Sequence, residues 1–124
     1  HKKEEGTYKD GKKDGLWTYW YENGQKKSEG TYKDGEQDGL SNWWYENGQK
    51  KSEGTYKDGN EDGLHIEWYE NGQKSSERIW DEKEDGLWTY FYENGQKYLE
   101  KTYKDGKEIS SKCWDRDGNE EECD

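Results

Sequence analysis

Few residues in this chain are of types that could carry out acid–base or nucleophilic chemistry. Apart from His1, which as the first residue is a candidate remnant of processing or cloning, the only histidine is His65. A catalytic base needs a nucleophile and an orienting group beside it. The chain repeats itself about every 24 residues, and the positions that match His65 hold Trp17, Ser41 and Trp88, which share no chemistry. The sequence therefore predicts a protein that is not an enzyme, with no catalytic residue and no cofactor.

Metal ligands are equally scarce. Residues 115–120, with the sequence DRDGNE, resemble a calcium loop but lack its full alternation of acidic ligands and its terminal glutamate, so a hairpin turn is favoured. Cys113 and Cys123 flank this turn, and two cysteines without further Cys or His clusters do not make a zinc site. No metal site is predicted.

The two cysteines are instead a candidate disulfide. If Asp115 pairs with Asn119 across the turn, Cys113 faces Glu121 and Cys123 is a diagonal neighbour, so a bond requires the end of the chain to shift. Such a bond would hold the terminal hairpin together and would imply an oxidising compartment. A disulfide and two free thiols both remain open at this point. The protein is expected to be soluble. It is expected to be exported or extracytoplasmic if the disulfide forms, and cytoplasmic if both thiols are free.

Composition limits both the fold and the partners. Charged residues make up 41% of the sequence and hydrophobic residues 24%, a balance typical of disordered chains. The eight Trp and eleven Tyr residues oppose disorder, because aromatic rings can cover a thin structure that lacks an aliphatic core. The net charge of -11 disfavours nucleic acid and anionic lipid headgroups, and no apolar run is long enough for insertion into a membrane.

The chain is built from a sequence repeat, which determines where the aromatic and charged residues lie. The stretch WYENGQKKSEGTYKDG occurs unchanged at residues 20–35 and 44–59, and alignment of the chain with itself extends the repeat over nearly the whole sequence. We expect a single repeat domain over residues 1–124, because stacked copies bury one another's faces. Its units are 6–29, 30–53, 54–77, 78–100 and a divergent C-terminal cap unit, 101–124.

Each unit carries two turn signals, which are Tyr8–Gly11 and Tyr21–Gly24 in the first unit. Both are expected to be type I turns with a glycine bulge, and two turns per unit give about nine or ten strands in all. The predicted fold is all-β, a repeat array of antiparallel β-hairpins that form an elongated, open, largely single-layer meander sheet. In the fourth unit the turn Trp80–Asp85 is one residue shorter, which predicts a local bend or altered twist.

Strand pairing divides the side chains between two faces. If Tyr21 pairs with Gln25 across the turn, Leu16 lies opposite Gly30, and Leu16 shares a packing face with Trp20. The opposite face differs between copies of the repeat, which makes its residues candidate contacts for a partner. Free drift at solvent-facing positions explains the differences equally well. The predicted partner-binding residues are Trp17, Tyr19, Trp43, His65, Glu67, Trp88 and Tyr90.

The segment Gly6–Gln25, with the sequence GTYKDGKKDGLWTYWYENGQ, resembles the MORN repeat variant of bacterial proteins often labelled YwqK-like antitoxins. The resemblance extends from about residue 6 to residue 119, and it implies an open array of β-hairpins that serves as an antitoxin-like, protein-binding scaffold. The Gly-Leu-Trp and Trp-Trp-Tyr elements are also similar to cell-wall-binding repeats, whose rings stack on sugars or enclose quaternary ammonium groups.

Together these observations predict a non-catalytic β-repeat scaffold that mediates protein–protein interaction with a partner of unknown identity. The alternative is a carbohydrate- or cell-wall-binding module that uses exposed aromatic columns. A further expectation is self-association through the open edges of the sheet, because edge strands carry unpaired peptide groups.

Overall fold

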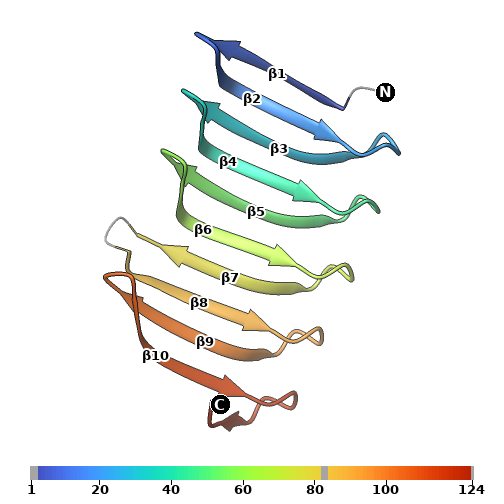
Figure 1. Cartoon of the computed structure of the whole chain (residues 1–124). Coiled ribbons are helices and arrows are strands. Elements are labelled where there is room, and N and C mark those ends of the chain that lie inside the picture. The colour runs from blue at the N-terminus through green and yellow to red at the C-terminus, as the bar shows by residue number, and fades with distance from the viewer. Residues whose placement is uncertain (1–2, 82–83, 124) are drawn as a thin grey trace. The chain divides into compact units, whose positions relative to one another are not determined.

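The computed structural model describes residues 3–81 and 84–123. Within these ranges, eleven antiparallel strands form one open sheet in which the order of the strands is their order in the chain (Figure 1). The predicted all-β array of antiparallel hairpins is therefore confirmed, with eleven strands where nine or ten were expected. No helix in these two ranges has the length and apolarity needed to span a membrane.

The strands belong to two compact units of the chain, His1–Glu61 and Asp62–Asp124. Their bounds are β1 (Glu4–Lys9), β2 (Lys12–Trp20), β3 (Lys26–Lys33), β4 (Glu36–Trp44), β5 (Lys50–Lys57), β6 (Asn60–Trp68), β7 (Lys74–Trp80), β8 (Gly86–Phe91), β9 (Lys97–Lys104), β10 (Lys107–Trp114) and β11 (Glu120–Glu121). Trp17 is the one buried hydrophobic residue in the described part of the chain. Packing therefore depends on contacts along the faces of the sheet, because no second layer encloses a core.

The two turn signals build two different turns. At the Asn-Gly turn, the Tyr21 amide donates to the Gln25 carbonyl at 2.9 Å and Gly24 has a φ of 88°, so the predicted type I turn with a glycine bulge is confirmed. At the Asp-Gly turn the same prediction is wrong, because both Asp10 (φ 52°) and Gly11 (φ 81°) are left-handed. Two consecutive left-handed residues make a type I′ turn, whose twist matches that of the paired strands.

Hydrogen bonds between successive turns explain why the turn sequences recur. The Tyr21 hydroxyl donates to the Trp44 carbonyl at 2.7 Å, and the Asn23 side-chain amide donates to the Glu46 carbonyl at 3.0 Å. At the opposite ends of the strands, the Gly35 amide donates to the Lys13 carbonyl at 2.9 Å. Within a unit, a turn thus binds the next copy of itself, which requires the same residues at the same spacing.

The shortened turn in the fourth unit changes the strand register. The Asp81 amide donates to the Asp85 carbonyl at 3.0 Å, and Glu84 adopts a φ of 63°. Glu82 and Lys83, which belong to the predicted turn, lie outside the described residues. β7 and β8 pair without interruption, whereas β3 and β4 shift register between Gly30 and Tyr32. Loss of one residue has therefore removed a β-bulge.

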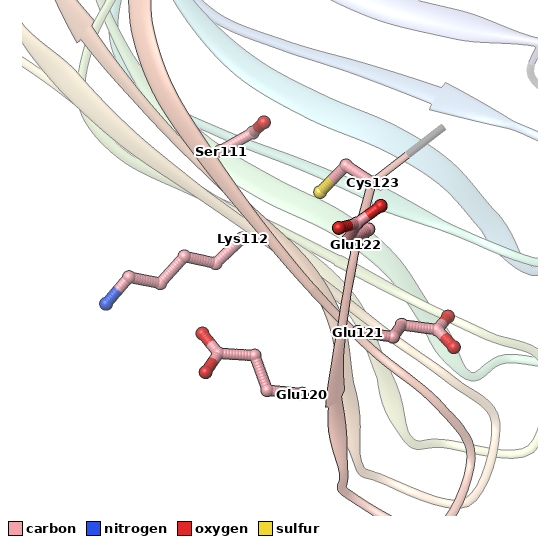
Figure 2. A pocket seen from close by; sticks show the side chains of 6 residues that line it. All are labelled: Ser111, Lys112, Glu120, Glu121, Glu122 and Cys123. Atoms are coloured by element: carbon pink, nitrogen blue, oxygen red, sulfur yellow. The ribbon is translucent and has the colours of Figure 1, made fainter.

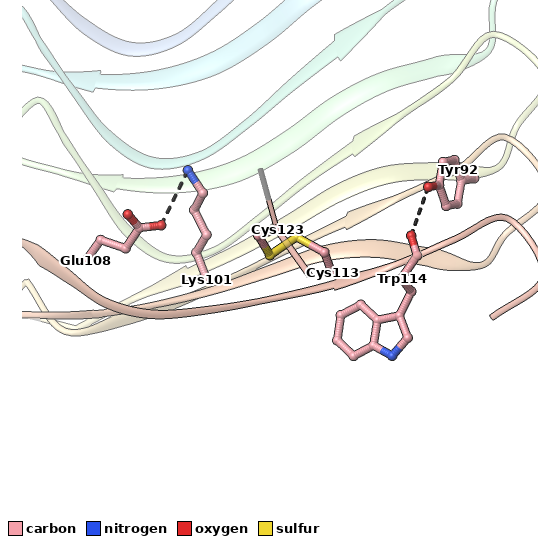
Figure 3. Close-up of a disulfide and its surroundings, with 6 residues drawn as sticks. All are labelled: Tyr92, Lys101, Glu108, Cys113, Trp114 and Cys123. Carbon is pink, nitrogen blue, oxygen red and sulfur yellow. Dashed lines mark hydrogen bonds and ion pairs between the residues drawn. A yellow bond between two sulfur atoms is a disulfide. The ribbon is translucent and has the colours of Figure 1, made fainter. Parts of the chain in front are cut away.

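A disulfide joins Cys113 and Cys123, whose Cα atoms are 5.3 Å apart (Figure 3). Cys113 faces Glu121 across the hairpin, as the turn predicted. β11 ends at Glu121, so Cys123 lies beyond the strand and reaches its diagonal partner there. The bond holds a two-residue strand against β10 at the C-terminal end of the sheet.

The turn before β11 should open in acid. The Asp115 carboxylate accepts hydrogen bonds from the Asn119 and Asp117 amides, both at 2.9 Å, and these bonds lower the pKa of Asp115 below its usual 3.8. Because the pKa of Asp115 is lower in the folded state, its ionised carboxylate stabilises the turn fully above about pH 3.8. This stabilisation is lost as the pH falls through the lower, folded-state pKa. The Asn119 amide NMR shift should titrate below pH 3.8, and in Asp115→Asn it should not. A flat Asn119 shift in the unaltered protein would contradict this assignment.

Candidate functional site

The register between β2 and β3 decides which side chains share a face. Trp17 lies opposite Gly30 and Leu16 opposite Thr31, so the predicted pairing of Leu16 with Gly30 is wrong. The register shifts near the turn, where Trp20 pairs with Lys26 and an extra residue, Lys27, enters β3. Because side chains alternate along a strand, a shift of one residue moves every glycine and serine of β3 to the other face.

The first variable column therefore forms the most buried row of the sheet, which we call the central row: Trp17, Ser41, His65 and Trp88. Trp17 is only 3% exposed, and Ser41 and His65 are also buried. A Cβ on Gly6 would lie 2.2 Å from the Trp17 ring, so the indole rests directly on the glycine backbone. Its Nε1 donates to the Thr7 carbonyl at 3.0 Å. The expectation that Trp17 and His65 offer surface to a partner is corrected, because their neighbours cover them.

In the N-terminal unit a lysine fills the space between the rings. The Lys13 ammonium lies 4.7 Å from the centroid of the Trp17 ring, 5.3 Å from that of Tyr19 and 5.1 Å from that of Tyr32. It also donates a hydrogen bond to the Tyr19 hydroxyl, which raises the pKa of Lys13. Cation–π attraction thus ties the face of β2 to β3 without aliphatic contacts.

The matching rings of the C-terminal unit pack against one another. The Trp88 centroid lies 4.9 Å from Tyr103 and 5.3 Å from Trp80, and the Trp80 and Tyr103 centroids are 5.4 Å apart. The Arg78 guanidinium lies 5.5 Å from the Trp88 centroid and 3.7 Å from a Glu67 oxygen. In this unit the Trp80 ring and the Arg78 guanidinium therefore pack against Trp88, whereas a lysine contacts the matching ring, Trp17, in the N-terminal unit.

The second variable column, Tyr19, Trp43, Glu67 and Tyr90, borders the central row, and we call it the outer row. Tyr19, Trp43 and Tyr90 are half-buried, as is Trp88, whereas Glu67 is exposed. Burial raises the pKa of the Tyr90 hydroxyl. In the N-terminal unit the rings of Tyr19 and Trp43 are thus partly open to solvent, and in the C-terminal unit the rings of Trp88 and Tyr90 are partly open beside the exposed Glu67 carboxylate.

The opposite face of the sheet carries exposed leucine and isoleucine side chains, which were not predicted from the sequence. The residue row that contains Leu16, predicted to pack, is exposed, and the prediction is wrong. We call it the leucine row, which consists of Leu16, Thr31, Leu40 and Thr55 in the N-terminal unit and of Leu64, Ile79, Leu87 and Thr102 in the C-terminal unit. Its leucines and isoleucine are between 39% and 55% exposed. Six of the eight Leu and Ile residues in the sequence are exposed when Ile109 is included. The scarce aliphatic side chains therefore lie on the surface instead of in a core.

Charges beside the leucine row are paired within their own strands. The Lys26 ammonium lies 2.9 Å from Glu29, and the same spacing joins Lys74 to Glu77 at 3.1 Å. Such exposed pairs add little stability. The two charges of each pair neutralise one another, although the chain as a whole carries a net charge of -11.

The site geometry offers binding surfaces more than reactive groups. His65 lies in the buried central row, away from any substrate in solution. Among the residues that the structure describes, no three His, Cys, Asp or Glu side chains gather to hold a metal ion. Exposed leucines on one face and half-buried rings on the other are the features available to a ligand.

A family model described as the MORN repeat variant matches the chain four times, at residues 13–34, 37–58, 61–81 and 84–105. The four matches together cover well over half of the sequence, and they coincide with the strand pairs β2–β3, β4–β5, β6–β7 and β8–β9. No curated protein matches the chain.

Proposed function

Because this chain belongs to the MORN repeat variant family, we propose that it is a non-catalytic scaffold that binds a protein partner through its leucine row. Repeats of this family generally serve as protein- or membrane-binding scaffolds. The observation that carries the proposal is the exposure of Leu64, Ile79 and Leu87, which lie side by side across β6, β7 and β8. Adjacent exposed aliphatic side chains on a charged protein mark an interaction surface.

The chemistry of the row favours a protein over the other candidates. An acidic net charge of -11 repels nucleic acid and anionic lipid headgroups. The neighbouring Lys74–Glu77 pair is already neutralised within β7, so the partner need not supply a strong charge. A strip of apolar side chains on the partner would cover the leucines and release their hydration water.

The test is capture of the partner by variants altered on one face only. Leu64→Thr, Ile79→Thr and Leu87→Thr together give the row the residue that it already holds at Thr31 and Thr102, so the sheet should persist. We expect this triple variant to bind the captured protein at least about tenfold more weakly, or about 1.4 kcal/mol. Quantitative capture, with circular dichroism to verify folding, measures the effect.

The matched control alters the opposite face. Trp43→Glu with Tyr90→Glu introduces the residue that the outer row holds at Glu67. This control should retain the partner at the level of the unaltered protein. Equal retention of the partner by the leucine-row triple variant would refute the proposed contact surface.

The second candidate function is carbohydrate binding by the outer row and Trp88. It is favoured by the half-buried rings of Tyr19 and Trp43 in the N-terminal unit and of Trp88 and Tyr90 in the C-terminal unit, which leave apolar ring surface open. A glycan array on the same preparations separates the two functions. Sugar binding that disappears in the Trp43→Glu, Tyr90→Glu variant, with no protein captured, would replace the first proposal with the second.

An antitoxin is the more specific form of the first proposal, in which the bound protein is toxic when free. The resemblance of Gly6–Gln25 to antitoxin-labelled repeats supports it, and the Cys113–Cys123 disulfide supports an oxidising compartment. Expression of the captured partner alone should arrest growth, and co-expression with this chain should relieve the arrest. Unimpaired growth with the partner alone would leave a scaffold without antitoxin activity.

A further inference from the structure

The leucine row differs between the two units of the chain. In the N-terminal unit, each leucine of the row lies opposite a threonine. In the C-terminal unit, Leu64 lies opposite Ile79 and Ile79 opposite Leu87, so three aliphatic side chains follow one another across β6, β7 and β8 (Figure 1). All three are between 39% and 46% exposed. We call these three residues the aliphatic strip, and it is the longest continuous apolar part of the row.

The aliphatic strip has polar borders. It ends at Thr102 on β9, which lies opposite Leu87. Along β7, Glu77 lies two residues from Ile79 on the same face, and its carboxylate is 3.1 Å from the Lys74 ammonium. A narrow apolar strip between polar side chains is suited to a segment that is apolar along one stripe and polar on both flanks.

The spacing of the strip fits a helix better than an extended segment. Neighbouring strands lie about 4.8 Å apart, so the three side chains repeat at about that interval. One turn of an α-helix rises about 5.4 Å, so a helix along the strip stays within about 1 Å of register over the three side chains. Side chains on one face of an extended segment repeat at about 6.7 Å, which puts them about 4 Å out of register over the same length.

The C-terminal unit also carries most of the excess negative charge of the chain. Residues 62–124 hold eighteen acidic and nine basic residues, a net charge of -9, whereas residues 1–61 hold thirteen and eleven, a net charge of -2. The Lys74–Glu77 pair beside the strip is neutral, so this charge acts as the field of the whole unit and not through one ion pair. A field of this sign attracts a cationic partner and raises its rate of association.

The groove at the C-terminal end of the unit adds charge but no apolar contact. One wall of this open groove is Glu120–Cys123, and the other is Ser111 and Lys112 (Figure 2). The disulfide from Cys123 to Cys113 holds the acidic wall beside β10. Among the described residues, no aliphatic or aromatic side chain lines the groove. The apolar contact in this unit is therefore assigned to the aliphatic strip.

We propose that the segment that binds the aliphatic strip is a basic amphipathic α-helix of a protein partner, which lies across β6, β7 and β8. Its apolar side chains, spaced three and four residues apart, contact Leu64, Ile79 and Leu87. Lysine and arginine side chains flank that stripe and are attracted by the charge of the C-terminal unit. Binding of such a helix rests on the proposed function, in which the leucine row is the contact surface.

Titration of the full chain with three synthetic peptides tests the class of segment. The first peptide has about 18 residues, enough to form a helix, with leucines spaced three and four apart and lysine on both flanks. The second carries glutamate in place of lysine, and the third has the composition of the first with leucine at alternate positions. Fluorescence anisotropy at low salt should show the first peptide binding at least about tenfold more tightly than either of the others. Its advantage over the glutamate peptide should shrink as salt is added.

Variants of the protein locate the bound peptide. Leu64→Thr, Ile79→Thr and Leu87→Thr together should weaken binding of the lysine peptide at least about tenfold. The matched control is Leu16→Thr with Leu40→Thr, which makes the same substitution in the N-terminal unit and should change the affinity less than about twofold. If circular dichroism shows that the triple variant does not fold, Ile79→Thr alone interrupts the strip and should weaken binding several-fold.

Equal affinity of the three peptides, or equal weakening by the strip substitutions and by the control, would overturn the basic helix. A captured partner that the triple variant loses, although the lysine peptide does not bind, would overturn the helix and leave the leucine row as the contact surface. A captured partner that the triple variant retains would refute the leucine row itself, and the helix with it.

Discussion

Trp17→Ala is expected to destabilise the N-terminal unit strongly, whereas Leu16→Ala should leave its stability nearly unchanged. Trp17 is 3% exposed, lies on Gly6, and its ring centroid is 5.0 Å from that of Tyr8. Loss of a buried tryptophan side chain costs about 3–5 kcal/mol, a large share of the roughly 5–15 kcal/mol that stabilises a small domain. Leu16 is 55% exposed, so its loss should cost below about 1 kcal/mol.

Urea unfolding followed by far-UV circular dichroism measures both free energies of unfolding. The comparison is informative because the two residues are adjacent in β2 and point to opposite faces. A larger loss of stability for Leu16→Ala than for Trp17→Ala would contradict the assignment of the packed face to the aromatic side.

Gly6→Ala should destabilise the same unit by about 1–3 kcal/mol, the usual cost of forcing extra atoms into a packed site. The added Cβ would lie 2.2 to 2.6 Å from three atoms of the Trp17 ring, so the ring must move off the strand. Lys13, which lies over the same ring, would lose part of its cation–π contact. This loss of stability is opposite to the usual effect of the substitution, because alanine normally forms strands better than glycine does.

The control for this substitution is Glu5→Ala, one position away on the exposed strand β1. It should change the free energy of unfolding by less than about 0.5 kcal/mol. Equal stability of Gly6→Ala and Glu5→Ala, measured by the same urea titration, would mean that the indole does not rest on the glycine.

Local signals in the sequence were sufficient to predict the architecture. The Asn-Gly and Asp-Gly dipeptides favour left-handed backbone, and their spacing gives the order of the strands and approximately their number. The pairing of Tyr21 with Gln25 across the first Asn-Gly turn was predicted correctly for the same reason. The type I′ geometry of Asp10 and Gly11 was missed, because both turn types accept Asp-Gly and the number of residues in the loop decides between them.

The assignment of faces failed at one residue. Nothing in the sequence marks Lys27 as the extra residue of a bulge, because lysine is equally acceptable at a regular exposed position of a strand. An undetected bulge reverses the parity of the strand, so Trp17 was placed outside and Leu16 inside. Gly6 and Gly30 were the available signal, since a glycine within a strand indicates that another group approaches its backbone closely.

Variation between copies was also misread at the central row. Trp17, Ser41 and His65 differ greatly in volume, which suggested surface positions, yet all three are buried. The row tolerates this variation because its neighbours change as well: Trp17 lies beside Gly6 and Gly30, whereas Trp88 lies beside Arg78 and Lys101. The leucines are exposed because the described elements are all strands of the sheet itself, and none of these elements covers that face.

Hydroxyl-radical footprinting of the free and partner-bound protein tests the central claim, that rings hold the sheet together while the leucine row binds the partner. In the free protein, Leu64, Ile79 and Leu87 should be oxidised readily and Trp17 slowly for its type. In the complex, oxidation of the three aliphatic residues should fall several-fold while that of Tyr90 stays the same. Protection of Tyr90 with unchanged oxidation of Leu64, Ile79 and Leu87 would contradict the account and place the partner on the aromatic face.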